Sequence, residues 1–474
     1  MPEKRENREE PLALEKKYYP LSSAQRRLYI VEQLALDSTG YNIPLRVILD
    51  GKLDREKLRD SFTEMIRRHE ILRTSFEEVN GEPMQKLHRQ VDFLLEYTDM
   101  RGESKTETEA RARQDKWIGD FAGPFDLAQA PLLRAALLRT GETETILLVD
   151  THHIITDGIS MSLFVKEIMA LYDGRSLAKP RLQYKDYSEW QNRRKEEGEL
   201  EKQELFWLDQ FNTGIPVLDL PTDFKRPAVK RFAGNMKEFS INDRDSRTLM
   251  ALTSQEEVTL FTMLLSLFYV LLSSVSGQED IVVGTSTAGR SHVDLEQVLG
   301  MFVNTLPLRN YPTGKKTFRR FLHQVKQKTL ECFDNQDYQF EDLADKVVEK
   351  TDPSRNPIFD VLFMFQNVSV IYAGIPAVEI PALKIRPYPG ESRVSKFDIT
   401  LWGAEKGNKL YFNFEYSTSL FKEETIDMFI DNFKGILSSV LEDPDRELSS
   451  ITAQTGSAAN EELSRFTDDL ENEC

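Results

Sequence analysis

The sequence predicts a mixed α/β (α+β) chain folded into two lobes. Its 474 residues are many for one domain. Helix-like and strand-like stretches alternate through both halves, so neither an all-helical nor an all-β class fits. A segment with Gly, Pro and dense charge over residues 173–203 interrupts the pattern, which then begins again. We therefore expect two mixed lobes with a connector in this segment.

Apolar periodicity predicts the elements of the first half. A helix begins at Ser22 or Ser23, whose hydroxyl can cap it, and its apolar face continues to Ala35. The elements that follow are a strand over 41–50, a helix over 53–69, strands over 71–76 and 93–97, a helix over 105–122, strands over 132–138 and 145–151, and a helix over 159–171.

The second half begins with the connector, which we expect to become a solvated helix. The elements after it are a helix over 255–275, a strand over 280–286, an extended run over 300–308, a helix over 317–333, strands over 357–366 and 410–416, and a helix over 423–441. The charged ends, residues 1–18 and 450–474, are expected to be flexible linkers.

Composition excludes several classes of protein. A net charge of −17 disfavours a nucleic-acid surface and an anionic membrane as partners. Cys332 and Cys474 are the only cysteines, too few for a disulfide framework or a four-cysteine zinc site. No secretory signal is visible, and the apolar stretch 260–272 is too short to cross a bilayer. We expect a cytoplasmic protein.

A group of polar residues follows the strand over 145–151. His152 and His153 are adjacent, Asp157 comes four residues after His153, and Gly158 follows it directly. Neighbouring strand residues point to opposite faces, so only one imidazole can face a substrate while the other packs internally. The following helix favours an anion or oxyanion near its N-terminus. Because histidine titrates near neutral pH, this group is a candidate proton-handling site.

Two other interpretations of the histidine pair stay open. A histidine on an apolar element is often a core residue with a satisfied hydrogen bond. A metal site would require Asp157 to fold back toward one of two rings that point apart. The chain has no Gly-x-Ser-x-Gly elbow and no glycine-rich phosphate loop, so a nucleotide-using enzyme is not indicated.

The string from His152 to Gly158 resembles the HHxxxDG signature of condensation domains of nonribosomal peptide synthetases. These domains belong to the chloramphenicol acetyltransferase-like superfamily. Further stretches are similar to the family's other motifs and occur in family order: Ser23–Tyr29, Arg68–Phe76, Tyr184–Trp190, Gly300–Arg309, Asn335–Glu341 and Ser354–Phe359. The resemblance therefore covers nearly the whole chain.

The resemblance implies a pseudodimer of two acetyltransferase-like lobes that form a V with a tunnel between them. The expected divisions are a linker over 1–18, an N-terminal lobe over 19–178 with the HHxxxDG motif, a C-terminal lobe over 179–449, and a linker over 450–474. The C-terminal lobe would include a floor loop, 284–304, and a latch near 385–396.

The resemblance also implies peptide-bond formation for antibiotic or other secondary-metabolite synthesis. Donor and acceptor carrier proteins would deliver an aminoacyl or peptidyl thioester and an aminoacyl amine on phosphopantetheine arms. A neighbouring adenylation domain is a further expected partner, the domain would be monomeric, and it would bind no cofactor or metal itself. His153 would act on the amine beside His152, Asp157 would pair with Arg68, and Gly158 would offer its N–H near the reacting centre.

The first motif, Ser-Ala-Gln-Arg-Arg-Leu-Tyr, resembles the subtype that joins two L-configured partners (LCL). Gly158 argues against an epimerising relative, which usually lacks this glycine. Two other function classes stay open. One is a free-standing acyltransferase that uses coenzyme A thioesters, and the other is a non-catalytic recruitment domain, which usually lacks the second histidine. Without a carrier or adenylating motif, we expect an excised domain or a short subunit.

Overall fold

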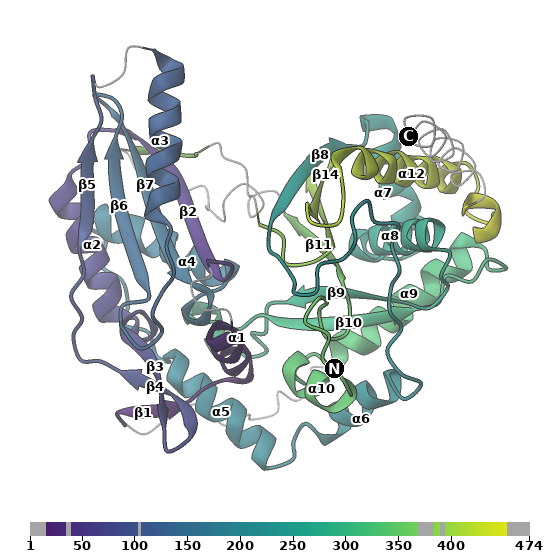
Figure 1. Ribbon diagram of the computed structural model, residues 1–474, viewed down its shortest axis with the longest axis horizontal. Coiled ribbons are helices and arrows are strands. Elements are labelled where there is room, and N and C mark those ends of the chain that lie inside the picture. The colour runs from purple at the N-terminus through teal and green to yellow at the C-terminus, as the bar shows by residue number, and fades with distance from the viewer. Residues whose placement is uncertain (1–15, 35–38, 103–105, 368–382, 389–393, 453–474) are drawn as a thin grey trace, which may run out of the picture. The chain divides into compact units, whose positions relative to one another are not determined.

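The computed structural model describes residues 16–34, 39–102, 106–367, 383–388 and 394–452, which form two compact units (Figure 1). Unit 1 takes the described residues up to Glu201, with Ala288–Val303 and 383–388. Unit 2 takes Lys202–Thr287 and the remaining described residues from Asn304 onward. The sequence placed the division between the lobes after residue 178, but the two units divide after Glu201. Helix α5 belongs to unit 1 because it packs against strand β1.

A five-stranded sheet organises unit 1. Its strand order is β12-β2-β7-β6-β5, with β5 and β6 parallel and the other pairs antiparallel. The strands are β2 (Asn42–Gly51), β5 (Leu95–Asp99), β6 (Leu133–Arg139), β7 (Glu144–His152) and β12 (Leu383–Pro387). A second sheet has the order β1-β4-β3 and contains β1 (Tyr18–Pro20), β3 (Thr74–Val79) and β4 (Glu82–Leu87).

Unit 1 has five helices in its described part, of which α2 and α4 cover one face of the larger sheet and α3 covers the other (Figure 1). They are α1 (Ser23–Leu34), α2 (Arg55–Arg68), α3 (Glu107–Phe121), α4 (Gly158–Tyr172) and α5 (Tyr184–Glu196), with the 3₁₀ turns η1 (Glu70–Arg73), η2 (His153–Ile155) and η3 (Val293–Gln297). Alternate residues of β7 point to opposite faces. Leu147 and Val149 join the core under α2 and α4, and Ile146 and Leu148 join the cluster under α3.

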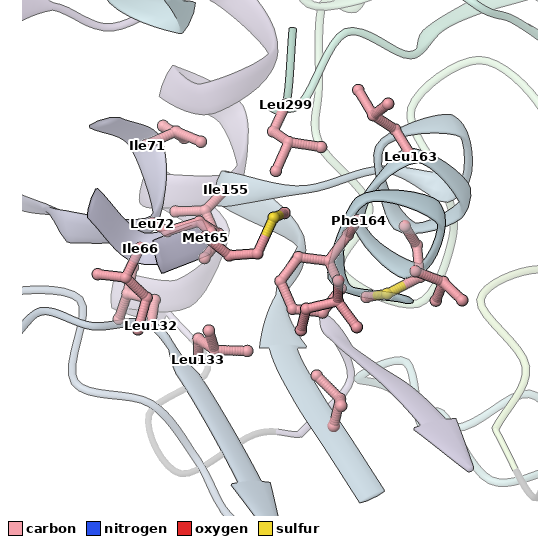
Figure 2. Close-up of a cluster of buried hydrophobic side chains, with 14 of the residues drawn as sticks. Met65, Ile66, Ile71, Leu72, Leu132, Leu133, Ile155, Leu163, Phe164 and Leu299 are labelled. Atoms are coloured by element: carbon pink, nitrogen blue, oxygen red, sulfur yellow. The ribbon is translucent and has the colours of Figure 1, made fainter. Parts of the chain in front are cut away.

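The turn η2 is anchored in the larger of these two cores. Figure 2 shows Ile155 among side chains of α2 and η1, including Met65 and Leu72. Ile154 and Ile155 are both fully buried. Burying two such side chains contributes roughly 1.5–3 kcal/mol each, which holds the turn firmly.

Unit 2 contains a six-stranded sheet with the order β10-β9-β11-β13-β14-β8, in which β11 is parallel to both neighbours. Its strands are β8 (Gly234–Ser240), β9 (Ile281–Thr287), β10 (Asn304–Asn310), β11 (Val361–Asn367), β13 (Ile399–Lys406) and β14 (Lys409–Ser417). Its helices are α6 (Glu201–Gln210), α7 (Asp243–Gln255), α8 (Leu260–Ser276), α9 (Phe318–Asp334), α10 (Phe340–Val347) and α12 (Glu423–Glu442).

Helix α8 is the core of unit 2. It contacts α9, α12, β9 and β11, and residues from Thr262 to Leu272 are all buried, which explains why its sequence is apolar on every side. Within the described part of the chain, no single helix has the length and apolarity needed to cross a membrane. The bent pair α7 and α8 meets those two criteria only when taken together.

Two polar residues of β10 fix the backbone of unit 2. The side chain of Asn304 donates to the carbonyls of Gln336 and Tyr338, each at 2.8 Å. Arg309 forms a bidentate ion pair with Asp280. These contacts are structural and lie within unit 2.

Candidate functional site

The candidate site residues lie where β7 ends and α4 begins. His152 is the last residue of β7, His153 opens η2, and Gly158 is the first residue of α4. Asp157 caps α4, since its Oδ1 accepts the N–H of Ser160 at 2.7 Å. A strand, a buried turn and a capped helix therefore position the whole group.

His153 has a defined tautomer. Its Nδ1 lies 2.8 Å from the carbonyl oxygen of Thr156, and a carbonyl can only accept, so Nδ1 carries the proton. In the neutral ring Nε2 then holds the lone pair, as a proton acceptor requires. The side chain is partly exposed, and the backbone N–H donates to the carbonyl of Tyr41 at 2.8 Å. The geometry thus presents a basic nitrogen on a fixed turn.

The side chain of His152 is buried in the interior. It is 1 % exposed, its Nδ1 accepts the N–H of Ile154 at 3.1 Å, and its ring meets Phe125 edge-on. One imidazole of the pair is therefore packed internally and the other is partly exposed, although His153 begins η2 and does not continue the strand whose alternation was the basis of the prediction.

Asp157 pairs with Arg290, which the sequence analysis did not identify. Arg290 Nη1 lies 2.9 Å from Oδ2, and Nη2 lies 3.2 Å from Oδ1. The N–H of Phe302 also donates to Oδ2, at 3.0 Å. Both charged side chains are buried, at 4 % and 0 % exposure. One feature of the sequence could have indicated this partner of Asp157: Arg290 is the only Arg or Lys between Gly284 and Asn304.

The expected pairing of Asp157 with Arg68 is wrong. Arg68 Nε binds Glu167 Oε2 at 2.8 Å, and His69 Nε2 lies 2.7 Å from the same oxygen. Glu167 follows Asp157 by ten residues, about 15 Å along α4, so the end of α2 meets the middle of that helix instead of its start. Burial alone would raise the pKa of Glu167, but hydrogen bonds from His69 and Arg68 leave it lowered.

Ser160 joins the segment 288–303 to the start of α4. Its hydroxyl donates to the carbonyl of Gly300 at 2.8 Å and accepts from the N–H of Gly300 at 3.0 Å and from Arg290 at 2.8 Å. A Cβ on Gly300 would lie 1.8 Å from the ring of Tyr184, so only glycine fits there. Serine is common in the first turn of a helix, so the sequence alone did not indicate that Ser160 belongs to the site.

Gly158 lies at the exposed N-terminus of α4. A Cβ added there meets nothing within 4 Å, so packing does not require glycine at this position. Its N–H belongs to the first helical turn, whose amides precede the intrahelical hydrogen bonds. Among the described residues, no group of three His, Cys, Asp or Glu side chains could hold a metal ion.

Asp150 brings a second buried carboxyl near the site, on the face of β7 that carries His152. Burial raises the pKa of Asp150 to about 6, although Arg134 at 3.2 Å and a hydrogen bond from Asn42 at 2.8 Å act in the opposite direction. Burial therefore outweighs the partners of this carboxyl.

Comparison with known proteins identifies the family. The family model described as "Condensation domain" matches residues 15–463. Gramicidin S synthase 2 of Brevibacillus brevis is 41 % identical over 453 residues, covering 95 % of this chain and 10 % of that protein. Tyrocidine synthase 3 of Brevibacillus parabrevis is 43 % identical over 445 residues, covering 94 % and 7 %.

Solved structures share the fold. The X-domain from teicoplanin biosynthesis superimposes with a TM-score of 0.83 at 23 % identity, covering 92 % of this chain and 98 % of that one. The chain spans about a tenth or less of the length of the two synthases. With a family model and relatives above 40 % identity matching nearly its full length, the chain belongs to the condensation-domain family.

Proposed function

We propose that this chain forms a peptide bond between two substrates held on carrier proteins. The donor is an aminoacyl or peptidyl thioester and the acceptor is an aminoacyl amine, each on a phosphopantetheine arm. The observation that carries the proposal is the hydrogen bond from His153 Nδ1 to Thr156, which leaves Nε2 as the acceptor nitrogen. Family membership supports the reaction class.

In the proposed reaction, the acceptor nitrogen attacks the thioester carbon. A C–N bond forms, the C–S bond breaks, and the departing sulfur takes up a proton. His153 Nε2 receives the proton that the amine loses and can return it to the thiolate. Asp157, neutralised by Arg290, holds the start of α4, where the N–H of Gly158 would lie near the carbonyl oxygen.

A thioester is already activated, so the protein supplies no nucleophile of its own. Alignment of two tethered groups can contribute up to roughly 7–11 kcal/mol in ideal intramolecular models. A general base contributes about 10²–10⁴-fold. We propose that His153 contributes the smaller of these two effects and that binding of the two arms contributes the larger.

The expected context of the domain is part of the proposal. We infer that a donor carrier, an acceptor carrier and a neighbouring adenylation domain are its partners, that it acts as a monomer in the cytoplasm, and that it binds no cofactor of its own. The first motif, Ser23–Tyr29, favours two L-configured substrates.

The test loads two carrier proteins with L-aminoacyl groups and measures dipeptidyl thioester formation. His153→Ala should be slower than wild type by about 10²–10⁴-fold. His323→Ala, which changes a half-exposed histidine of unit 2, is the matched control and should be as fast as wild type. Equal rates for wild type and His153→Ala would remove His153 from the chemistry.

Two results would favour the other function classes. Turnover of a soluble coenzyme A thioester with a free amine, without carriers, would indicate a free-standing acyltransferase. No product from any loaded pair would indicate a recruitment domain.

A further inference from the structure

Helix α1 reaches the turn that carries His153 with two side chains on one face. Gln25 and Glu32 are seven residues apart, two helical turns, so they lie nearly above one another. Gln25 Nε2 donates to the carbonyl of Ile154 at 3.1 Å. Glu32 Oε2 lies 3.6 Å from Nε2 of His152. Helix α1 therefore contacts both the strand end and the turn.

The tautomer of His152 follows from its own contacts. Nδ1 accepts the amide N–H of Ile154, so in the neutral ring the proton resides on Nε2. That N–H faces the carboxylate of Glu32. Both side chains are buried, at 1 % and 8 % exposure, and within the described residues neither Nε2 nor Oε2 has another hydrogen-bond partner. The two adjacent imidazoles thus hold their protons on opposite nitrogens.

This arrangement holds both backbone polar groups of Ile154, the residue that follows His153. The N–H of Ile154 is held by His152, and its carbonyl is held by Gln25. If the ring of His152 changed tautomer or rotated, the N–H of Ile154 would lose its acceptor in the interior, which is unfavourable. A hydrogen-bond acceptor at Glu32 favours the one orientation of the His152 ring in which Nδ1 accepts the N–H of Ile154 and so keeps the turn in place.

We propose that Glu32 is a positioning residue for peptide-bond formation. It accepts a hydrogen bond from His152 Nε2–H and so holds η2 in the geometry that presents His153 Nε2 to the amine. The separation of 3.6 Å exceeds hydrogen-bond length by a few tenths of an ångström, and small rotations of the glutamate side chain close it. The proposal rests on the proposed function, because it requires His153 to take part in the reaction.

Three variants of the full chain separate positioning from a general role in folding. Glu32→Gln keeps an oxygen that can accept, whereas Glu32→Leu removes the acceptor at similar volume. Gln33→Leu adds the same side chain at the neighbouring exposed position of α1 and is the control. Each is assayed for kcat and KM with carrier-bound substrates, and its imidazole tautomers are read from ¹⁵N chemical shifts.

We expect wild type to show the Nε2–H tautomer for His152 and the Nδ1–H tautomer for His153. Glu32→Leu should mix the tautomers of His152 and lower kcat by about 10–100-fold, as loss of an orienting partner does, with KM unchanged. Glu32→Gln should restore both readouts, and Gln33→Leu should alter neither.

Each contrary outcome has a clear meaning. Wild-type kcat and tautomers in Glu32→Leu would overturn the proposal, as would equal losses in Glu32→Gln and Glu32→Leu. Should Glu32→Leu fail to fold, the wild-type spectrum still decides, because an Nδ1–H tautomer for His152 contradicts the assignment. The ¹⁵N spectra report the tautomers without any turnover of substrate. A failure of the proposed function would instead appear in the activity assay, as a His153→Ala protein that is as fast as wild type.

Discussion

The carboxylate of Asp157 connects three parts of unit 1. It caps α4 through Ser160, forms a bidentate ion pair with Arg290, and accepts the N–H of Phe302. A buried ion of this kind is tolerated only when its charge is paired and its lone pairs are used. The residue therefore acts on the site by fixing backbone positions around His153.

Removing either partner of this pair should destabilise the protein more than it changes the chemistry. We expect Asp157→Ala and Arg290→Met each to lower the free energy of unfolding by about 3–5 kcal/mol, because each leaves a buried charge unpaired. Urea denaturation of the single and double variants measures the coupling between the two positions.

Arg68→Met is the control for this cycle, because Arg68 binds Glu167. It should show no coupling to Asp157→Ala, since the two sites share no partner. An Asp157→Ala protein with unchanged melting, or strong coupling between Asp157 and Arg68, would contradict the pairing.

The raised pKa of Asp150 predicts that the free energy of unfolding depends on pH. Its pKa is about 6 in the folded protein and about 3.9 in an unfolded chain. Between these values the folded state binds the extra proton, so stability falls as pH rises from 4 to 6. Asp150→Asn keeps an oxygen for the hydrogen bond from Asn42 and removes the ionisation.

We therefore expect Asp150→Asn to exceed wild type in stability at pH 7 by at most about 3 kcal/mol and to match it near pH 4. Thermal melts of both proteins from pH 4 to 7 measure this difference. A difference that does not change with pH would show that the folded carboxyl titrates at its ordinary value.

At the scale of elements, two glycines beside the site should respond in opposite ways to substitution. Gly300→Ala places a methyl group against the ring of Tyr184, where it overlaps, and should cost about 1–3 kcal/mol or more. Gly158→Ala places the same group in open space at the start of α4 and should change stability by less than about 1 kcal/mol. Equal melting temperatures for the two variants would contradict this contrast.

Helices and strands with strong apolar periodicity were predicted well from the sequence. The predictions over 53–69, 317–333 and 423–441 correspond to α2, α9 and α12. The helix predicted over 255–275 corresponds to α8, which begins five residues later because Thr259 caps it, whereas α7, which ends at Gln255, was not predicted. The buried residues of α7 are Ser246, Leu249 and Thr253, two of which are polar, so apolar periodicity did not reveal this helix.

In the segment 173–203 the charges predicted only part of the structure. The charged residues over 192–203 are mostly exposed, as expected, but α5 begins before them and buries Tyr184, Tyr187 and Trp190. The rings of Tyr184 and Tyr187 pack with that of Phe302, at centroid distances of 4.9 and 4.6 Å. A contact with residues more than a hundred positions away leaves no periodic signal. The partner of Asp157 was missed for the same reason.

At the scale of the whole molecule, the mixed class and the two-part organisation were predicted, but the path of the chain was not. Unit 1 includes Ala288–Val303 and strand β12, both of which lie far along the sequence. β12 extends the sheet by pairing with β2, and Arg386 on it binds Asp50 and Glu144. The latch expected near 385–396 overlaps β12, and its residues 389–393 lie outside the described residues, as do 1–15 and 453–474.

Because unit 1 is not continuous, a chain ending at residue 201 should not fold stably. It lacks Arg290, which leaves the buried charge of Asp157 unpaired at about 3–5 kcal/mol, and it lacks the ring of Phe302, worth a similar amount. Together these losses approach the whole stability of an ordinary domain, about 5–15 kcal/mol.

Near-UV circular dichroism and urea unfolding of residues 1–201 should show no cooperative tertiary structure. Attaching residues 288–303 through a Gly/Ser linker should restore part of it. A cooperative transition in the shorter chain would mean that residues 1–201 hold the site without that segment.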